Sequence, residues 1–287
     1  MTIQTAKTVA ELREQVAIAK RAGRRVGCVP TMGALHAGHE SLLVAARRQS
    51  DFVVATIFVN PTQFAPGEDL ERYPRPLEDD LSLCDSAGVD TVFLPSPNDV
   101  YPQDDATTVQ VSGLTDVLEG RHRPTHFAGV TTVVAKLFGI VQPDVAFFGE
   151  KDFQQLAVLS RMTADLFLPI EVVGCPIVRD ADGLALSSRN RYLSPSERTR
   201  ALELSRSLES LERELTDGGD FAAARDRFCR RLAETDGLAL DYAVVADPET
   251  LESLDAPRRR MVALVAATVG TTRLIDNRRI ELLDNPA

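Results

Sequence analysis

Apolar positions along the first 175 residues alternate between two spacings. Short runs at Val26–Pro30 and Phe52–Val59 are apolar at almost every position, as expected of parallel strands that are covered on both faces. Between them, Glu40–Gln49 places its leucines and alanines at the spacing of an amphipathic helix. A strand–helix–strand unit of this kind is typical of an α/β sheet with right-handed crossovers.

The same alternation continues to about residue 175, where the pattern changes. Ser194–Glu197 has the spacing of a capping box and begins a long charged helix, which Gly218 and Gly219 end. A second helix and three strand-like runs follow, and this order predicts a small α+β domain. Helices are predicted over 8–22, 78–87, 130–141, 153–165 and 221–234, and strands over 90–94, 145–148, 170–173, 240–245, 261–267 and 272–275.

The overall composition predicts an acidic, soluble protein of the cytoplasm. The formal net charge of -10 argues against a general nucleic-acid binder, which would usually carry a basic face. We find no apolar run long enough to span a bilayer, and residues 1–20 lack the apolar core of a signal peptide. The four cysteines are widely scattered, and we expect them to be buried free thiols in a reducing compartment.

Two of the four histidines, His36 and His39, lie three residues apart where the first apolar strand passes into its helix. Ligands of open α/β sheets bind beyond the carboxyl ends of the strands, with anionic groups at helix N-termini. Gly33 and Gly38 permit tight backbone angles and close approach of a ligand. Two imidazoles placed there can donate hydrogen bonds to phosphate oxygens and stabilise the charge that develops in a transition state.

Other interpretations of this turn stay open on the residues alone. Both histidines could be ordinary loop residues, or part of a metal site. A zinc site would need a third ligand, and no cysteine, histidine or carboxylate stands at a convincing spacing. The chain has neither G-x-x-x-x-G-K-[ST] nor G-x-G-x-x-G, so P-loop and dinucleotide-binding classes lose their usual support.

Two further groups of polar residues follow predicted strands. Asn60 and Gln63 come after the second strand, and their neutral amides suit a hydroxy acid, although the same residues would also form a plain turn. Gly149–Asp152 follows the strand at 145–148, where Lys151 can meet a phosphate and Asp152 can accept from a ribose hydroxyl or cap the helix. A lysine is disfavoured at a helix N-terminus, and an anionic ligand would remove that conflict.

Five stretches in one order carry a resemblance to a known family. They are PTMGALHAGHESL (30–42), FVNPTQF (58–64), RPTHFAGV (123–130), FGEKDFQQ (148–155) and LSSRNRYLS (186–194). The chain resembles the pantoate–β-alanine ligase family of the H-x-G-H nucleotidylyltransferase superfamily over essentially its whole length. The resemblance implies a Rossmann-like domain for ATP and pantoate over residues 1–176 and a small α+β lid domain over 177–287.

The resemblance also implies a reaction in two steps. ATP and the carboxylate of (R)-pantoate give pantoyl adenylate and pyrophosphate, and the amine of β-alanine then displaces AMP. Mg²⁺ should be required with ATP, without a tightly bound organic cofactor. The family is typically a homodimer through the N-terminal domain, and we expect no nucleic-acid or membrane partner.

The family's site residues carry over by position. His39 is the expected proton donor, and His36, Lys151 and Arg189 are the other expected catalytic residues. Leu186 replaces a methionine that is frequent in the family, and both side chains are apolar. The expected ATP contacts are Met32, Gly33, Ala34, Leu35, His36, Ala37, Gly38, His39, Gly149, Glu150, Lys151, Asp152, Val178 (through its backbone), Leu186, Ser187, Ser188 and Arg189. The expected pantoate or β-alanine contacts are Gln63, Gln155, Asn60, Arg123 and Tyr73. His126 is expected to be structural. Asp79 and Asp80 match positions where the family can place Mg²⁺.

Three other functions remain to be distinguished. An H-x-G-H enzyme acting on phosphopantetheine or nicotinamide mononucleotide would transfer AMP to a phosphate and show no step that depends on β-alanine. A nucleotide sensor or scaffold would keep the fold and lose a key residue, and we find none lost. A redox or metal protein would hold a metal that elemental analysis detects.

Overall fold

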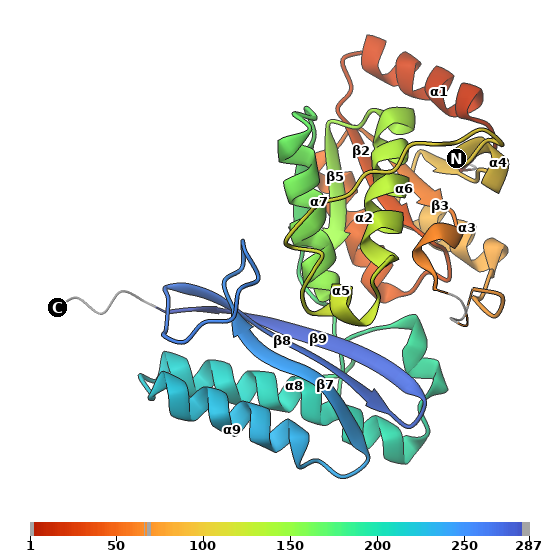
Figure 1. Cartoon of the computed structure of the whole chain (residues 1–287). Coiled ribbons are helices and arrows are strands. Elements are labelled where there is room, and N and C mark those ends of the chain that lie inside the picture. The colour runs from red at the N-terminus through yellow and green to blue at the C-terminus, as the bar shows by residue number, and fades with distance from the viewer. Residues whose placement is uncertain (1–2, 66, 68–69, 283–287) are drawn as a thin grey trace. The chain divides into compact units, whose positions relative to one another are not determined.

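The structure is a computed structural model that describes residues 3–65, 67 and 70–282 (Figure 1). Within it the chain forms two compact units. The first comprises the chain up to Glu150 together with Gln154–Pro176. The second comprises Lys151–Phe153 and the chain from Ile177 onward, so three residues of the second unit interrupt the first. None of the helices among the described residues is long and apolar enough to cross a membrane.

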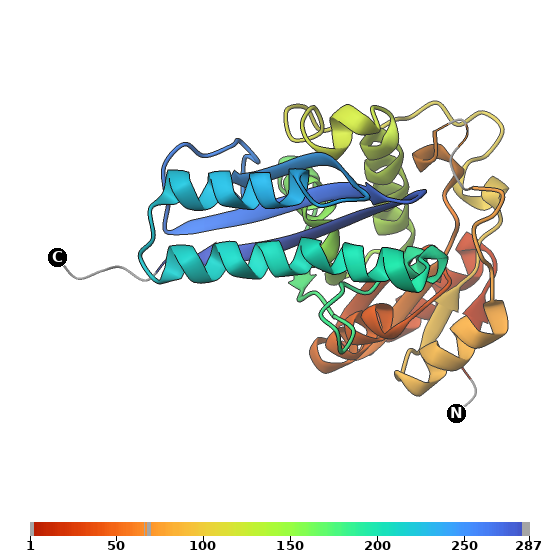
Figure 2. The same ribbon diagram turned by 90° about the horizontal axis from the view of Figure 1, so that it is seen from below.

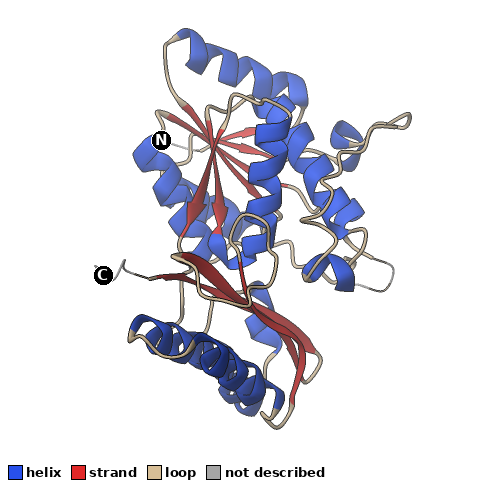
Figure 3. Cartoon of the chain, turned by 60° about the vertical axis from the view of Figure 1, so that its left-hand side comes forward, coloured by secondary structure: helices blue, strands red, loops and turns tan. Residues whose placement is uncertain are grey.

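The first unit is built on a six-stranded sheet in the order β1-β4-β3-β2-β5-β6, and every neighbouring pair is parallel. This confirms the Rossmann-like α/β class predicted from the alternating pattern. Figure 3 shows these strands fanned by the usual right-handed twist. The strands are β1 (Gln4–Ala6), β2 (Val26–Thr31), β3 (Phe52–Ile57), β4 (Thr91–Phe93), β5 (Val145–Gly149) and β6 (Glu171–Cys175).

Helices cover both faces of this sheet. Leu43 of α2 and Cys84 of α3 pack with Val53 and Phe147 on one face. Phe138 of α6 meets Phe148 on the other, with ring centroids 6.4 Å apart. The helices are α1 (Val9–Arg21), α2 (Ala37–Gln49), α3 (Leu77–Ser86), α4 (Pro97–Val100), α5 (Glu119–His122), α6 (His126–Val141) and α7 (Phe153–Asp165), with 3-10 turns η1 (Pro61–Gln63) and η2 (Glu150–Asp152).

The strand order reverses at β2. The chain runs outward from β2 through β3 to β4, and β5 and β6 lie on the opposite side of β2. The carboxyl ends of β2 and β5 therefore adjoin where the order changes, which is where open parallel sheets bind their ligands. The loops that follow β2, β3 and β5 carry three of the sequence motifs.

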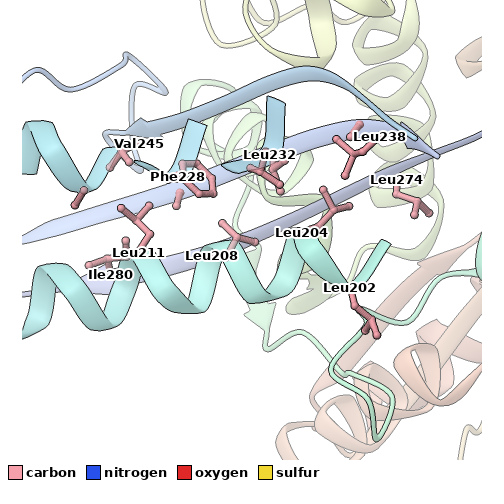
Figure 4. Packing of buried hydrophobic residues seen from close by; sticks show 14 of the residues in the cluster. Leu202, Leu204, Leu208, Leu211, Phe228, Leu232, Leu238, Val245, Leu274 and Ile280 are labelled. Atoms are coloured by element: carbon pink, nitrogen blue, oxygen red, sulfur yellow. The ribbon is translucent and has the colours of Figure 1, made fainter. Parts of the chain in front are cut away.

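The second unit packs two helices on an antiparallel sheet in the order β7-β8-β9. Figure 2 shows α8 and α9 running side by side, and Figure 4 shows the apolar side chains between them and the strands. Leu204 and Leu208 of α8 meet Phe228 and Leu232 of α9 in this buried cluster. The elements are the 3-10 turn η3 (Ser188–Tyr192), α8 (Pro195–Thr216), α9 (Phe221–Ala233), β7 (Leu238–Ala246), β8 (Arg260–Val269) and β9 (Thr272–Glu281).

Candidate active site

The turn after β2 is the centre of the candidate site. Gly33 and Ala34 both adopt left-handed backbone angles, with φ of 82° and 52°. Glycine takes this conformation without strain, whereas Ala34 is held in it by its surroundings. The two residues turn the chain sharply from the end of β2 into the N-terminus of α2, where His36 is the N-cap.

The two histidines cap the helix reciprocally. The backbone N–H of Gly38 donates to His36 Nδ1 at 3.1 Å, and the backbone N–H of His36 donates to His39 Nδ1 at 3.3 Å. The two ring centroids are 4.2 Å apart. Because each Nδ1 accepts a hydrogen bond, the proton of each neutral ring is on Nε2. The turn thus holds two N–H donors of fixed tautomer at the N-terminus of a helix.

Asp80 is buried, although the acidic residues beside it in the sequence suggest an exposed helix face. Its side chain is buried, with an exposed fraction of 1%. Oδ2 accepts from the backbone N–H of Ala34 at 2.9 Å, and Oδ1 accepts from Leu35 at 2.7 Å. Asp79 beside it is exposed. Among the described residues, no group of three histidine, cysteine or carboxylate side chains could hold a metal ion.

The side-chain amides of Asn60 and Gln63, which follow β3, are hydrogen-bonded to each other. Asn60 is 1% exposed, and its Nδ2 donates to Gln63 Oε1 at 3.0 Å and to the Gly129 carbonyl at 3.1 Å. Its Oδ1 accepts from the Tyr101 hydroxyl at 2.8 Å. Gln63 Nε2 donates to Met32 Sδ at 3.1 Å, which joins this network to the histidine turn. Asn60 therefore orients Gln63 from beneath, and Gln63 is the more accessible of the two amides.

Helix α6 and Arg123, which precedes it, contact the backbone of η1 at Gln63. The Gln63 carbonyl lies 3.3 Å from Arg123 Nη2, which donates to it, and 3.1 Å from His126 Nδ1. A Cβ added at Gly129 would lie 2.5 Å from the Thr62 carbonyl oxygen, so α6 approaches η1 more closely than any other residue would allow. Arg123 and His126 therefore both contact the backbone of η1 at Gln63.

Of two tyrosines in this region, the sequence analysis named Tyr73 as a site residue and did not name Tyr101. Tyr73 was expected to be a substrate contact, and its ring packs edge-on to Phe64 with centroids 6.1 Å apart. Tyr101 was not singled out, yet it bonds Asn60 and lies beneath the Lys136 ammonium, 4.6 Å from the ring centroid. No motif marks Tyr101, because its partners are about 40 and 35 positions away in the chain.

The two glutamines after β5 have separate roles. Gln154 is buried, and its amide bonds the backbone of Leu114, Val117 and Glu119 at 2.7–3.0 Å. Gln155, the expected substrate contact, is only half-buried. Gly149 ends β5, and Glu150 and the exposed Asp152 lie in η2.

The remaining expected ATP contacts belong to the second unit. The Lys151 carbonyl accepts from Asn277 Nδ2 at 2.9 Å, and Arg279 lies over the Phe153 ring at 5.0 Å. The Leu186 N–H donates to the Val178 carbonyl at 2.9 Å, which closes a short hairpin. Ser187 caps η3 by accepting from the N–H of Arg189 at 3.3 Å, so Ser187, Ser188 and Arg189 begin a 3-10 turn.

An ion pair between the half-buried Arg179 and the buried Asp276 holds the hairpin that ends in this turn. Arg179 donates from Nη1 to Asp276 Oδ2 at 2.7 Å and from Nη2 to Oδ1 at 3.0 Å. Asp276 is 3% exposed, and Arg179 also donates to the Gly183 carbonyl at 3.1 Å. Bidentate pairs of this kind fix geometry as well as charge. The pair thereby orients the segment that leads to Ser187–Arg189.

The cysteines take no part in the candidate site. Cys28, Cys84 and Cys175 are buried, and Cys229 is half-buried. Burial raises the pKa of Cys28 and Cys84 to about 12 and that of Cys175 to about 11. Thiols with such values are protonated and unreactive near neutral pH. The sequence predicted four buried free thiols, which is correct for three of them and not for Cys229.

The fold and the paired histidines define an α/β enzyme built on a Rossmann-like domain. The family model of pantoate-beta-alanine ligase matches residues 4–279. Pantothenate synthetase of Moorella thermoacetica is 52% identical over 97% of this chain and 99% of its own length. Pantothenate synthetase 1 of Bradyrhizobium diazoefficiens is 53% identical over 94% of this chain and 95% of its own length. The chain therefore belongs to the pantoate-beta-alanine ligase family.

Solved structures agree with this assignment. The crystal structure of pantothenate synthetase from Thermus thermophilus matches with a TM-score of 0.91 at 49% identity, over 96% of this chain and 99% of that one. Pantoate-beta-alanine ligase from Francisella tularensis, complexed with beta-gamma ATP and beta-alanine, matches with a TM-score of 0.77 at 32% identity, over 96% and 97%.

Proposed function

We propose that the protein joins (R)-pantoate to β-alanine at the expense of ATP, through pantoyl adenylate, and releases AMP and pyrophosphate. A carboxylate resists attack by an amine until one of its oxygens becomes part of a good leaving group, and adenylation provides this. Family membership supports the reaction, and the Francisella relative, complexed with beta-gamma ATP and beta-alanine, supports two of the three substrates.

The observation that carries the mechanism is the pair of capped imidazoles. With both Nδ1 atoms accepting from backbone N–H groups, the N–H donor of each neutral imidazole is Nε2, and both rings lie at the N-terminus of α2. In the first step these donors stabilise negative charge on the α-phosphate and the departing pyrophosphate. Lys151 and Arg189 supply positive charge to the phosphate oxygens.

In the second step the enzyme mainly has to orient the activated carboxyl group and the β-alanine amine toward each other. Gln63 and Gln155 bind pantoate and place its activated carboxyl group for attack by the β-alanine amine. Because Asn60 is buried and its amide is already bonded, it acts by fixing the Gln63 amide rather than by touching substrate. Asn60 was expected to contact pantoate directly, and we propose this supporting role for it instead.

Mg²⁺ enters as part of the MgATP substrate. The Asp80 carboxylate already accepts two backbone N–H groups, and the described residues lack a ready cluster of ligands, so the acidic pair does not fit a resident metal site. The ion on ATP neutralises phosphate charge.

ATP–pyrophosphate isotope exchange with MgATP and pantoate, with β-alanine omitted, tests the proposed reaction. Exchange that depends on pantoate establishes a separate adenylation step, and subsequent addition of β-alanine should release AMP. Exchange that requires nicotinamide mononucleotide or phosphopantetheine instead would assign the protein to another H-x-G-H activity. A protein that binds ATP without any exchange would contradict the proposal.

His39→Ala tests the histidine roles. We expect kcat for exchange to fall roughly 10²-fold or more, as when a general acid or an oxyanion donor is removed. His122→Ala is the matched control, because His122 is exposed at the end of α5 and has no assigned role. Wild-type turnover in His39→Ala would refute the assignment.

We also propose that the enzyme acts in the cytoplasm as a homodimer through its N-terminal domain. The dimer is an expectation from the family resemblance, so it is tested directly. Sedimentation equilibrium should give a mass near twice 31.3 kDa. A mass of one chain would overturn the dimer without affecting the proposed reaction.

A further inference from the structure

We infer that Asp80 is a positioning residue for the catalytic histidines: its buried carboxylate holds the turn that carries them, and it is not a metal ligand. The inference rests on the roles proposed above for His36 and His39. It assigns a function to a side chain that the sequence placed in a candidate Mg²⁺ site.

The first step of the argument is the geometry of the carboxylate. Its two oxygens take the consecutive backbone N–H groups of Ala34 and Leu35, at 2.9 and 2.7 Å. Among side chains, only the carboxylates of aspartate and glutamate offer two acceptor oxygens and no donor, so each backbone N–H finds its own acceptor here. The contact spans 46 positions of the chain, so it ties the turn to the start of α3.

The second step is the strain that the carboxylate offsets. Ala34 has a left-handed φ of 52° and is buried, a conformation that costs a residue with a Cβ. A Cβ at Gly33 would lie 2.9 Å from Asp80 Oδ2, so the side chain packs directly against the turn. Charge-assisted hydrogen bonds are stronger than neutral ones, and the first turn of a helix favours a negative charge.

The third step connects the turn to the chemistry. His36 is the residue that follows Leu35, and its backbone N–H is the donor that fixes His39 Nδ1. If Leu35 moves, the donor of that cap moves with it, and both Nε2 atoms shift. A displacement of about 1 Å in a catalytic group can cost roughly 10²-fold in rate.

Asp80→Asn is the test, because it keeps size and shape while turning one of the two acceptors into a donor that faces a backbone N–H. We expect kcat for pantoate-dependent exchange, at saturating MgATP and pantoate, to fall at least about 10-fold. Backbone amide exchange of Ala34 and Leu35, measured by NMR, should accelerate. Glu78→Gln is the matched control in the same first turn of α3, exposed and outside the site, and it should behave as wild type.

The concentration of free Mg²⁺ that gives half-maximal activity separates the two roles of Asp80. A positioning residue leaves this concentration unchanged, whereas loss of a metal ligand raises it. A raised Mg²⁺ requirement with normal protection of Ala34 and Leu35 would overturn the inference, and so would wild-type kcat in Asp80→Asn.

A double variant keeps this inference separate from the proposed function. If Asp80 acts through the histidines, the loss of kcat caused by Asp80→Asn should be smaller in the His39→Ala background than in the wild type, because only His36 remains to be displaced and coupled sites are not additive. If His39→Ala alone is fully active, the proposed histidine roles fail. The amide protection of Ala34 and Leu35 still reports whether Asp80 holds the turn.

Discussion

Replacing Gly129 by alanine should displace Gln63, whose side-chain amide we propose binds pantoate, without unfolding the protein. Gly129 lies inside α6, and an added Cβ would lie 2.5 Å from the Thr62 carbonyl oxygen and 2.7 Å from the Cα of Gln63. Both neighbours are backbone atoms, so a change of side-chain rotamer cannot relieve the contact. Ordinary contact begins near 3.4 Å, so η1 or α6 must move by about 0.9 Å.

The structure sets the size of the two opposing effects. Overpacking of a tight interface costs about 1–3 kcal/mol, whereas glycine to alanine inside a helix gains about 1 kcal/mol. The free energy of unfolding should therefore fall by no more than about 2 kcal/mol. A shift of nearly 1 Å at Gln63 should lower kcat/KM for pantoate by roughly 10²-fold.

The assay is pantoate-dependent ATP–pyrophosphate exchange, with urea unfolding of the same samples. Gly139→Ala is the control on the same helix, because a Cβ there meets no atom within 4 Å. That variant should be fully active and about 1 kcal/mol more stable. Full activity toward pantoate in Gly129→Ala would show that the position of η1 does not govern substrate binding.

Three further predictions follow from buried polar and thiol groups. Asn60→Ala leaves the partners of a buried amide without their hydrogen bonds, so the free energy of unfolding should fall by about 1–3 kcal/mol. In steady-state kinetics, KM for pantoate should rise more than KM for ATP. Arg179→Ala removes the ion-pair partner of the buried Asp276 carboxylate, so the free energy of unfolding of the second unit, measured in urea, should fall by about 3 kcal/mol. Arg179→Lys should lower it by less. The raised pKa of Cys28 and Cys84, about 12, means that the folded state retains both protons as pH rises past the unfolded value of about 8.5. Stability should therefore fall from about pH 8.5 toward 12, and at pH 8 a thiol reagent should label these cysteines only after unfolding; labelling of the native protein would contradict this.

The alternating pattern predicted the parallel sheet well because its strands are buried on both faces. The helix at 153–165 was predicted with the bounds that α7 has. Helix α6 begins at His126, four positions before the predicted start, because the segment around Gly129 reads as a loop until its packing against η1 is known. Strand β1 was missed, since its three residues carry only one buried side chain, Ala6.

Strand β9 shows why the second unit was harder to predict. It was expected to end at residue 275 and extends to Glu281. The additional residues include Asp276 and Asn277, which look like a loop in sequence and are buried by their bonds to Arg179 and Lys151. These partners lie about a hundred positions or more away, so no local pattern reveals them.

The same limit applies to the candidate site. Local motifs carry the histidine pair and Gln63, and their proposed roles begin from those motifs. The burial of Asp80 and Asn60 could not be predicted, because the sequence does not show which polar side chains end up buried against distant backbone groups. Tyr101 was overlooked for the same reason. Residues that support a site through long-range contacts are the ones that a single sequence hides.

The span of 46 positions between Ala34 and Asp80 has a consequence for the order of folding. The reciprocal histidine cap is local and can form as soon as α2 does. The turn before it gains its carboxylate anchor only when β3 and α3 have joined the sheet, a closure whose entropic cost grows slowly with the length of the intervening chain. A nascent chain that ends before Leu77 therefore carries both histidines on an unanchored turn. The donors reach their working positions only after half of the first domain has been made.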